Sequence, residues 1–350
     1  MAYTTIDKPS EHFNTVTYSG SETPQTITGV NFSADMAWFK SRTGTAAGGN
    51  IYDTVRGISD GWLYTNEADA SNNSGQPQIT LNSDGYVLNS GYDVINDGSS
   101  TYVSWNWKGA NGTASNTNGD VTTTVSANQT AGFSIVSYTV SGGSAYNTGH
   151  GLSEAPELVL WKSRDRTASW SAYAKGIGNA KKLVLDTNGG EANTGGWNST
   201  TPTNTLFSHG GYYDGDNIIY YAFHSVKGYS KISKYTGNGS SSVGPFIYTG
   251  FKPAFILRKR TDTTGSWLMQ DNKRPGSNRI VTDSLPSNNS VLYSQTNESE
   301  LFNNELDILS NGFKLRATDT FGNAAGGTYI YLAIAENPFV TSTGIPATAR

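Results

Sequence analysis

One segment of this chain occurs twice without a gap, and this repeat strongly restricts the folds that are possible. "LVLWKSRDRTASW" occupies residues 158–170, and "FILRKRTDTTGSW" occupies residues 255–267. Each segment runs from apolar residues into a basic cluster and ends on Ser-Trp. A shorter version, "ADMAWFKSRTG", lies at 34–44. Because self-similarity indicates that one folding unit is used several times, we expect three copies of a single unit.

The rest of each copy has the pattern of antiparallel strands. Each copy opens on an alternating segment with an aromatic residue and later contains a turn between apolar residues. The turns are "SDGYVL" at 83–88, "SHGGYY" at 208–213 and "SNGFKL" at 310–315. Asp-Gly and Asn-Gly pairs in this setting are strong hairpin signals, because both central positions favour positive φ. We expect an all-β fold of three tandem antiparallel β-sandwich repeats, lectin-like or jelly-roll-like, of about 100 residues each.

Each copy closes on a segment that is apolar at most positions. The three segments are "YVSWNW" at 102–107, "YYAFHS" at 220–225 and "YLAIAE" at 331–336. A small residue stands near the centre of each one, namely Ser104, Ala222 and Ala333. A continuous apolar run with a small central residue predicts a strand that is buried on both faces, where another element approaches closely.

These correspondences divide the chain into domains. We expect the first repeat with an N-terminal segment at 1–109, the second repeat at 132–228, the third at 229–340, and a C-terminal tail at 341–350. Residues 110–131 are rich in Gly, Ser, Thr and Asn, which predicts a linker with room for one short strand. Because nothing separates the second repeat from the third, those two should pack as a pair and the first should be separable.

The composition argues against several classes of function. The 350 residues carry a formal net charge of -4, which gives no reason to expect a nucleic-acid partner. The chain has no Cys, so disulfides, thiolate metal sites and cysteine nucleophiles are excluded. No apolar run approaches the ~18 residues of a membrane span, and the first residues lack a signal-peptide pattern. We therefore expect a soluble chain without membrane insertion.

Segments from every copy carry a resemblance to a known group of proteins. They include "MAYTTIDKPSEHFNTVTYSG" at 1–20, "TYVSWNWKG" at 101–109, "AFHSVKGYSKISKYTGNGS" at 222–240 and "GGTYIYLAIAENPF" at 326–339. Together they resemble three-repeat structural proteins of marine and environmental tailed bacteriophages, which are lectin-like in fold. The resemblance implies a tail fibre or other virion protein that is assembled in the host cytoplasm and contacts other virion proteins. It also implies a homo-oligomer, with a trimer favoured.

Three features could carry chemistry, and each also has a simpler interpretation. "GISDG" at 57–61 matches the Gly-x-Ser-x-Gly elbow of hydrolases, but a loop-like segment follows where the elbow requires a helix. "DGDN" at 214–217 could supply oxygen ligands to calcium, yet it lacks the full EF-hand pattern, and a tight turn is favoured. The four histidines are isolated and have no zinc-ligand spacing; they are His12, His150, His209 and His224. We expect no metal and no cofactor.

The basic cluster that ends the repeated apolar run has two interpretations. The structural one, favoured because the cluster recurs in every copy, is that these residues mark where a core strand leaves the sheet for water and discourage edge-to-edge pairing. The functional one is that they contact a partner subunit or an acidic surface glycan, together with the neighbouring tryptophans. The candidate contact residues are Lys162, Arg164, Arg166, Trp170, Arg258, Arg260 and Trp267.

The function that we expect is adhesion without turnover. The chain holds 8 Trp and 20 Tyr, which can stack on sugar rings while Asn, Ser and Thr bond to sugar hydroxyls. We therefore expect a phage virion protein that adheres to a host surface glycan and is not an enzyme. Two alternatives stay open. One is a purely architectural capsid decoration or tail-tip adaptor, and the other is a polysaccharide depolymerase, because a pair of catalytic carboxylates leaves no local signature.

Overall fold

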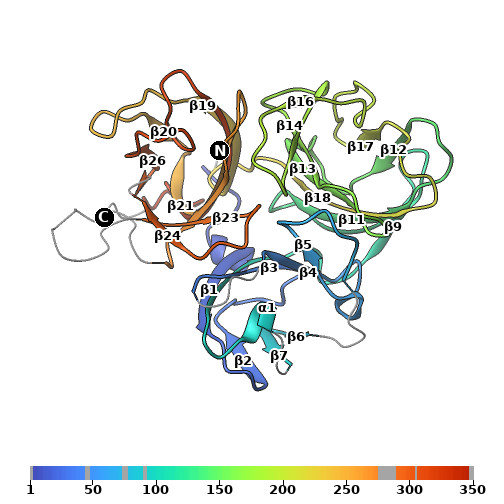
Figure 1. Ribbon diagram of the computed structural model, residues 1–350, viewed down its shortest axis with the longest axis horizontal. Coiled ribbons are helices and arrows are strands. Elements are labelled where there is room, and N and C mark those ends of the chain that lie inside the picture. The colour runs from blue at the N-terminus through green and yellow to red at the C-terminus, as the bar shows by residue number, and fades with distance from the viewer. Residues whose placement is uncertain are drawn as a thin grey trace.

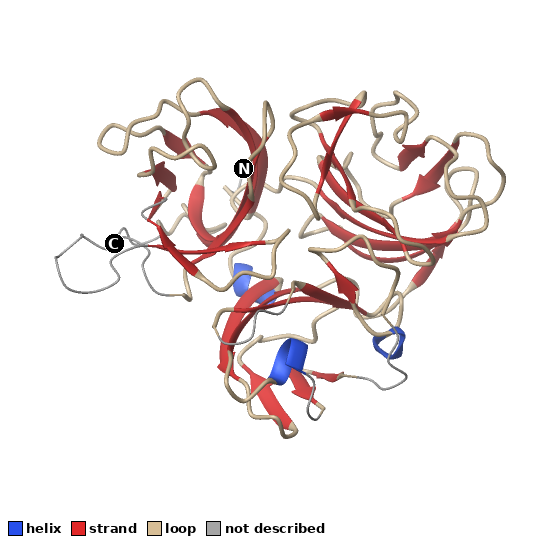
Figure 2. Ribbon diagram, viewed as in Figure 1, coloured by secondary structure: helices blue, strands red, loops and turns tan. Residues whose placement is uncertain are grey.

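The computed structural model describes residues 3–43, 48–72, 78–89, 93–274, 289–303 and 306–346. Nearly all regular structure in these ranges is β-strand, and the one α-helix among them is α1 (Asp93–Asn96). The strands pair in an antiparallel manner. The expected all-β, antiparallel fold class is therefore confirmed. Figure 2 shows the predominance of strands, with short helical turns that include η1 (Pro9–Glu11) and η2 (Ile58–Asp60).

Three large sheets of five, eight and six strands surround a common centre (Figure 1). The first sheet has the order β1 (Phe13–Ser19), β8 (Thr101–Trp107), β3 (Met36–Ser41), β4 (Asn50–Asp53) and β5 (Leu63–Tyr64). The second sheet has the order β16 (Ala192–Asn193), β15 (Lys181–Val184), β14 (Ser171–Ala174), β13 (Leu158–Ser163), β18 (Asn217–Phe223), β11 (Phe133–Thr139), β10 (Thr123–Asn128) and β9 (Ala114–Asn116). The third sheet has the order β19 (Ser230–Thr236), β27 (Thr328–Pro338), β21 (Phe251–Arg260), β22 (Trp267–Asp271), β23 (Asn289–Tyr293) and β24 (Leu301–Asn303).

The three large sheets share a common arrangement of strands. In each, the opening strand pairs with the closing strand, and the closing strand pairs with the strand that carries the basic cluster. The equivalent lysines of the three basic clusters lie opposite apolar residues of the closing strands, in the pairs Lys40–Val103, Lys162–Ile219 and Lys259–Ile330. The repeated sequence therefore occupies the same strand position in every large sheet.

A small sheet covers the outer face of each large sheet. The first small sheet contains β2 (Gln25–Thr28), β7 (Gly85–Leu88) and β6 (Ile79–Asn82), the second contains β12 (Tyr146–Gly149) and β17 (Leu206–His209), and the third contains β20 (Phe246–Tyr248), β26 (Gly312–Leu315) and β25 (Leu306–Leu309). Aromatic pairs fill the three spaces between large and small sheets, such as Phe39–Tyr86, Tyr173–Phe207 and Phe313–Tyr331. Burial of such rings contributes most of the packing energy there.

The inner faces of the three large sheets meet in one central core. It joins apolar residues of every large sheet, for example Trp105 from the first, Leu160 from the second and Leu257 from the third. Each closing strand is thus covered on both faces, and Ser104, Ala222 and Ala333 have no exposed surface. This agrees with the burial that the sequence predicted for these strands, because only small side chains fit where two layers approach closely.

Two of the predicted hairpins form, and one does not. Asn82 pairs with Gly85 between β6 and β7, and Leu309 pairs with Gly312 between β25 and β26. The turn at 208–213 does not close a hairpin, because β17 pairs with β12 while β18 belongs to the second large sheet. The segment after β17 is instead a loop that crosses from the small sheet to the large one.

Residues 110–131, predicted as a linker, are part of the second sheet. They contribute β9 and β10, and β10 pairs with β11 along its length. The start of the segment is also fixed to the first sheet, because a carboxylate oxygen of the buried Asp35 accepts hydrogen bonds from the backbone nitrogens of Gly109 and Asn111, at 2.7 and 3.1 Å. The shared central core gives a physical reason to expect that the first copy does not separate from the other two.

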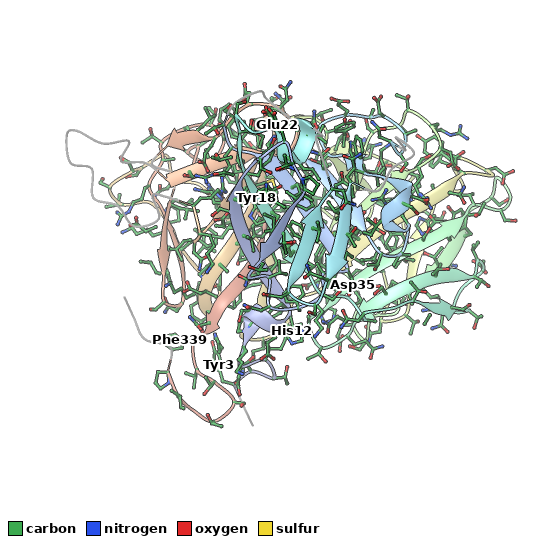
Figure 3. All side chains as sticks on the ribbon, turned by 90° about the horizontal axis from the view of Figure 1, so that it is seen from below. Tyr3, His12, Tyr18, Glu22, Asp35 and Phe339 are labelled. Atoms are coloured by element: carbon green, nitrogen blue, oxygen red, sulfur yellow. The ribbon has the colours of Figure 1, made fainter. Side chains whose placement is uncertain are left out.

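The segments near the two ends of the chain lie together. Figure 3 shows Tyr3, His12 and Phe339 at one end of the molecule, with Tyr18 and Glu22 at the opposite end. The rings of Tyr3 and Phe339 have centroids 6.4 Å apart, and the backbone nitrogen of Ser342 donates to a carboxylate oxygen of Asp7 at 2.6 Å. The described part of the predicted tail at 341–350 is thus bonded to the N-terminal segment.

Candidate functional site

A cavity lined by aromatic residues opens beside the second small sheet, at the edge of the second large sheet. Its volume is about 280 Å³. The aromatic side chains that line it are Tyr146, Trp161, Trp197, His209, Tyr212 and Tyr213, and the polar ones are Ser171, Lys182, Asn193 and Thr194. Pockets of this size that combine a mainly apolar wall with a few polar groups are the usual binding sites for small ligands.

Strand alternation places the residues of the large sheet in this cavity. Along β13, Leu158 and Leu160 belong to the central core, so Trp161 points to the opposite, outer face. Ser171 lies directly opposite Trp161 in the register of β13 and β14. On β15, Leu183 belongs to the central core, and its neighbour Lys182 therefore faces outward.

The wall of the cavity consists of stacked rings that continue to the molecular surface. Trp161 and Tyr213 stack with centroids 5.8 Å apart and an interplanar angle of 24°, and Tyr146 stacks on His209 at 4.9 Å. Tyr212 and Tyr213 are 55% and 37% exposed, although both are large aromatic residues. Their exposed rings form the mouth of the cavity and offer apolar faces to a ligand.

A buried hydroxyl fixes the rings of the wall. The Tyr138 oxygen accepts a hydrogen bond from Nε1 of Trp161 at 3.1 Å and lies 3.1 Å from the hydroxyl of Tyr146. His209 bonds to the same hydroxyl and to Thr148, and its burial lowers its pKa to about 3, so the imidazole is neutral near pH 7. The indole nitrogen of Trp161 is thus satisfied within the protein, and its largely buried ring supports the more exposed ring of Tyr213.

Three polar side chains of the cavity have no partner within the part of the chain that the structure describes. These are the hydroxyl of Ser171, the ammonium group of Lys182 and the amide of Asn193. Groups that are placed on strands but not used in the fold can bond to a ligand without breaking an internal contact. The cavity therefore combines a rigid aromatic wall with free donors and acceptors.

Tyr213 has a backbone conformation that is unusual for a bulky residue. Its φ angle is 65°, in the left-handed region that disfavours side chains other than Gly, Asn and Asp. The conformation is maintained by the bond from the nitrogen of Asp216 to the Tyr213 carbonyl, at 3.0 Å, and by the Arg166 guanidinium 5.0 Å above the ring. Strain of this kind is concentrated at ligand sites, where it orients a side chain for contact.

The lysines of the basic clusters are not exposed to water. The structural interpretation of the repeat, in which these residues mark where a strand leaves the sheet for water, is therefore wrong for the lysines. Lys40, Lys162 and Lys259 are all completely buried. Nζ of Lys162 donates to the carbonyls of Ala168, Ser163 and Ala68, at 2.7, 3.0 and 3.0 Å. An ammonium group can be buried only when its donors are satisfied, and backbone carbonyls satisfy this one.

The three lysines connect neighbouring sheets in a ring. Lys162 of the second sheet reaches Ala68, beside the first sheet, and Lys40 of the first sheet donates to the Thr296 carbonyl beside the third, at 2.6 Å. Lys259 of the third sheet lies 3.4 Å from the Asn188 carbonyl beside the second. The contacts run in the same direction around the central core.

Most of the other predicted contact residues are also internal. Trp170 and Trp267 are buried, and their Nε1 atoms donate to the carbonyls of Tyr64 and Val184 on the neighbouring large sheets. Arg258 is buried as well, and its guanidinium bonds to Gln270. The side chains of these residues and of Lys162 are thus used inside the fold and present almost no exposed surface to a glycan.

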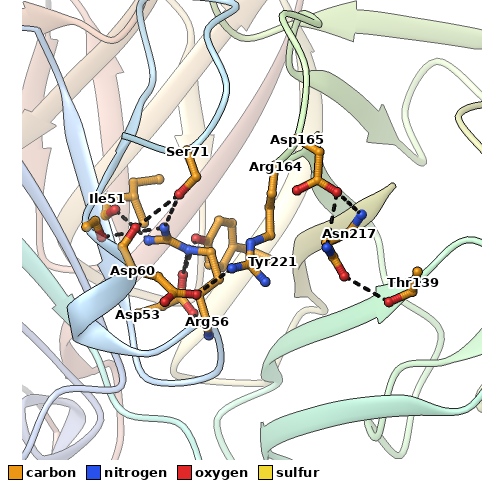
Figure 4. A network of polar contacts seen from close by, with 11 residues as sticks. Ile51, Asp53, Arg56, Asp60, Ser71, Thr139, Arg164, Asp165, Asn217 and Tyr221 are labelled. Atoms are coloured by element: carbon orange, nitrogen blue, oxygen red, sulfur yellow. Dashed lines mark hydrogen bonds and ion pairs between the residues drawn. The ribbon is translucent and has the colours of Figure 1, made fainter. Parts of the chain in front are cut away.

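The remaining three candidates are engaged in ion pairs. Arg164 pairs with Asp60 across the junction of the first and second sheets, at 2.6 Å (Figure 4). Arg260 pairs with Asp262 at 2.9 Å, and Arg166 pairs with Asp216. Arg166 also lies over the Tyr213 ring, and so it is the one predicted contact residue that adjoins the cavity.

The motifs considered for catalysis and calcium binding form turns. Ile58–Asp60 is a short 3-10 helix between Gly57 and Gly61, both of which have positive φ, and the strand-to-helix arrangement of a nucleophile elbow is not formed there. In the 214–217 turn, Asp214 accepts from the nitrogen of Gly142 and Asp216 pairs with Arg166. Among the described residues, no group of three or more His, Asp or Glu side chains is arranged to bind a metal ion.

The fold and the cavity together define an all-β protein of antiparallel sheets with a cavity lined by aromatic residues. The chain belongs to the family described as "Domain of unknown function (DUF7483)", whose model matches residues 8–338. No curated protein and no solved structure matches the chain. No helix within the described ranges is long and apolar enough to span a membrane.

Proposed function

We propose that this chain is a glycan-binding protein without catalytic turnover, and that the cavity of the second sheet is its binding site. The observation that carries the proposal is the Trp161–Tyr213 stack beside the free side chains of Ser171, Lys182 and Asn193. Aromatic faces pack against the C–H faces of sugar rings, and hydroxyl, ammonium and amide groups bond to sugar oxygens. Among the residues that the structure describes, no Asp or Glu lines the cavity, which favours binding over cleavage, since glycosidases require two carboxyl groups.

The proposal includes three tandem β-sandwich repeats, each formed by a large sheet and the small sheet that covers it. The shared strand order and the equivalent positions of Lys40, Lys162 and Lys259 support this division. The lysine contacts then join the repeats in a ring. A single chain thus contains three joined repeats. Several such chains on one particle would raise the avidity for a glycan surface.

The proposed location is the phage virion, at the tail, where the chain would contact other virion proteins and adhere to a host glycan. The support for this location is the resemblance of the sequence to phage structural proteins. A homo-oligomer, with a trimer favoured, remains part of the proposal.

Binding of the full-length chain to a glycan array tests the proposed function. The site variant is Tyr212→Ala, because this ring is 55% exposed at the cavity mouth and its loss costs little packing. The matched control is Phe246→Ala, which removes a ring that is 47% exposed on β20, away from the cavity. We expect Tyr212→Ala to weaken binding about tenfold and Phe246→Ala to leave it unchanged. Absence of any glycan binding, or equal effects of the two variants, would refute the proposal.

A purely architectural role is the second candidate, and one exposed aromatic surface favours it. Tyr248 is 49% exposed beside Phe246, and Nζ of Lys231 lies 5.3 Å from the centre of its ring. The Tyr3 hydroxyl lies 3.3 Å from that of Tyr248, so this surface adjoins the N-terminal segment. If the role is architectural, the double variant Phe246→Ser with Tyr248→Ser should lower incorporation into particles, while cavity variants should not affect adsorption.

A further inference from the structure

Lys182 is the only charged side chain among the residues that line the cavity, because His209 is neutral there. The other cations nearby are already neutralised. Lys181 pairs with Glu191 at 3.6 Å, and Arg166 pairs with Asp216. Lys182 forms no ion pair within the described residues, so its charge is available to a ligand.

The position of Lys182 differs from that of the lysines that hold the fold together. Lys162 is completely buried, and backbone carbonyls accept all its bonds. Lys182 is only partly buried, on the outer face of β15 opposite Ala192. Within the described ranges no contact uses its ammonium group, which leaves this group free to bond to an anionic ligand.

We propose that the cavity selects a saccharide that carries an anionic group, with Lys182 as the partner of that group. The inference rests on the proposed glycan-binding function and adds the charge of the ligand. The sugar ring packs on Tyr213, the anionic group accepts a bond from Lys182, and neighbouring hydroxyls bond to Ser171 and Asn193. A bond between two charged groups is about twice as strong as a neutral one, and partial enclosure of the cavity weakens the competition from water.

The lining residues also argue against a cationic ligand. A group of aromatic rings such as Trp161, Tyr212 and Tyr213 can bind a quaternary ammonium ion through its π faces. In this cavity such an ion would meet the ammonium group of Lys182, and no carboxylate lines the cavity to offset the repulsion. The same reasoning makes a neutral sugar a weaker ligand than an anionic one.

The test is calorimetric titration of the full-length chain with three probes of equal length. They are trigalacturonate, its carboxyl-reduced counterpart galactotriose, and sulfated galactotriose, which separates a carboxylate from a sulfate as the preferred anion. The wild-type chain should bind at least one anionic probe about tenfold more tightly than galactotriose, and high salt should reduce this preference.

The variants are Lys182→Gln, Lys182→Arg and, as matched control, Lys181→Gln on the same strand. Lys182→Gln should abolish the preference but keep binding of galactotriose, whereas Lys182→Arg and Lys181→Gln should retain the preference. Equal affinity of the wild-type chain for all three probes, or a preference that survives Lys182→Gln, would overturn the inference and leave the proposed function intact. If the wild-type chain binds no probe and no glycan on the array, the proposed function fails as well.

Discussion

Nζ of Lys162 lies 3.0 Å from the carbonyl oxygen of Ala68, so a strand of the second sheet is bonded to a loop of the first. Lys40 and Lys259 make the corresponding contacts with Thr296 and Asn188. The basic cluster that recurs in the sequence therefore holds the three large sheets around one core. Its lysines act inside the molecule, and none of them lines the aromatic cavity.

Cooperative unfolding is the first consequence of this arrangement. Because the central core and the lysine contacts involve all three large sheets, we expect a single urea transition in which Trp fluorescence and far-UV circular dichroism coincide. Limited proteolysis should not cut residues 110–131 preferentially, since β9 and β10 are paired in the second sheet. Two separated transitions, with early release of residues 1–109, would contradict this prediction.

Stability should depend on pH through the buried lysines. Burial lowers the pKa of Lys259 to about 7 and those of Lys40 and Lys162 to about 8. An unfolded lysine keeps its proton until about pH 10.4, so between about pH 7 and 10 the unfolded chain binds more protons than the folded one. The contribution of these lysines to stability therefore rises with pH across that window and is constant below it.

The measurement is the urea midpoint of the wild-type chain and of Lys259→Met between pH 6 and 10. The difference between the two midpoints separates the titration of Lys259 from that of all other groups. The wild-type chain should gain stability relative to Lys259→Met as the pH rises. A difference that stays constant from pH 6 to 10 would show that Lys259 keeps its ordinary pKa.

The second sheet shows how a buried ion pair of the first sheet can be replaced. Nε of Arg56 lies 2.5 Å from the carboxylate of Asp53, and both side chains are fully buried (Figure 4). Asp271 and Arg274 repeat the pair in the third sheet, but the equivalent residues of the second sheet are Ala174 and Ile177. An ion pair and an apolar pair therefore fill corresponding positions.

We expect Asp53→Ala alone to lower the free energy of unfolding by about 3–5 kcal/mol, because it leaves the Arg56 guanidinium buried without its partner. Asp53→Ala combined with Arg56→Ile copies the second sheet and should recover at least half of that loss, since no charge is then buried. Urea unfolding of both variants measures this. A double variant that is less stable than Asp53→Ala would refute the equivalence of the positions.

Tyr213 allows binding to be separated from stability. Asn tolerates a left-handed backbone, so Tyr213→Asn relieves strain while it removes the stacking contact with Trp161, and the two effects should offset to within about 1 kcal/mol. Binding of a glycan should fall at least tenfold, because the aromatic platform is lost. If Tyr213→Asn keeps full affinity, the platform is not part of the site.

The repeat in the sequence indicated the fold class and the shared strands, but most of the contact residues that it suggested lie inside the fold. Lys162 has a counterpart in every copy and Trp170 has one in the third copy, and both are buried where neighbouring sheets pack together. The cavity uses a position where the copies differ, since Phe39, Trp161 and Arg258 occupy equivalent places on β3, β13 and β21. A search for positions at which the three copies carry different residue types would have identified Trp161.

The loop that carries Tyr212 and Tyr213 could not be recognised from local pattern alone. "SHGGYY" resembles the hairpin turns of the other copies, yet β17 pairs with a distant strand and the residues after it cross between two sheets. Pairing with a partner about sixty residues away is decided by tertiary packing. The pairing of residues 110–131 with the second sheet was not predicted for the same reason, because β10 is held by its pairing with β11.

A crystal structure of the full-length chain soaked with its best-binding oligosaccharide tests the central claim most directly. We expect a sugar ring stacked on Tyr213 in the cavity of the second sheet, with polar contacts to Ser171 and Asn193 and with an anionic group at Lys182. A sugar bound only at another surface, such as that of Phe246 and Tyr248, or an empty cavity at saturating ligand, would contradict it.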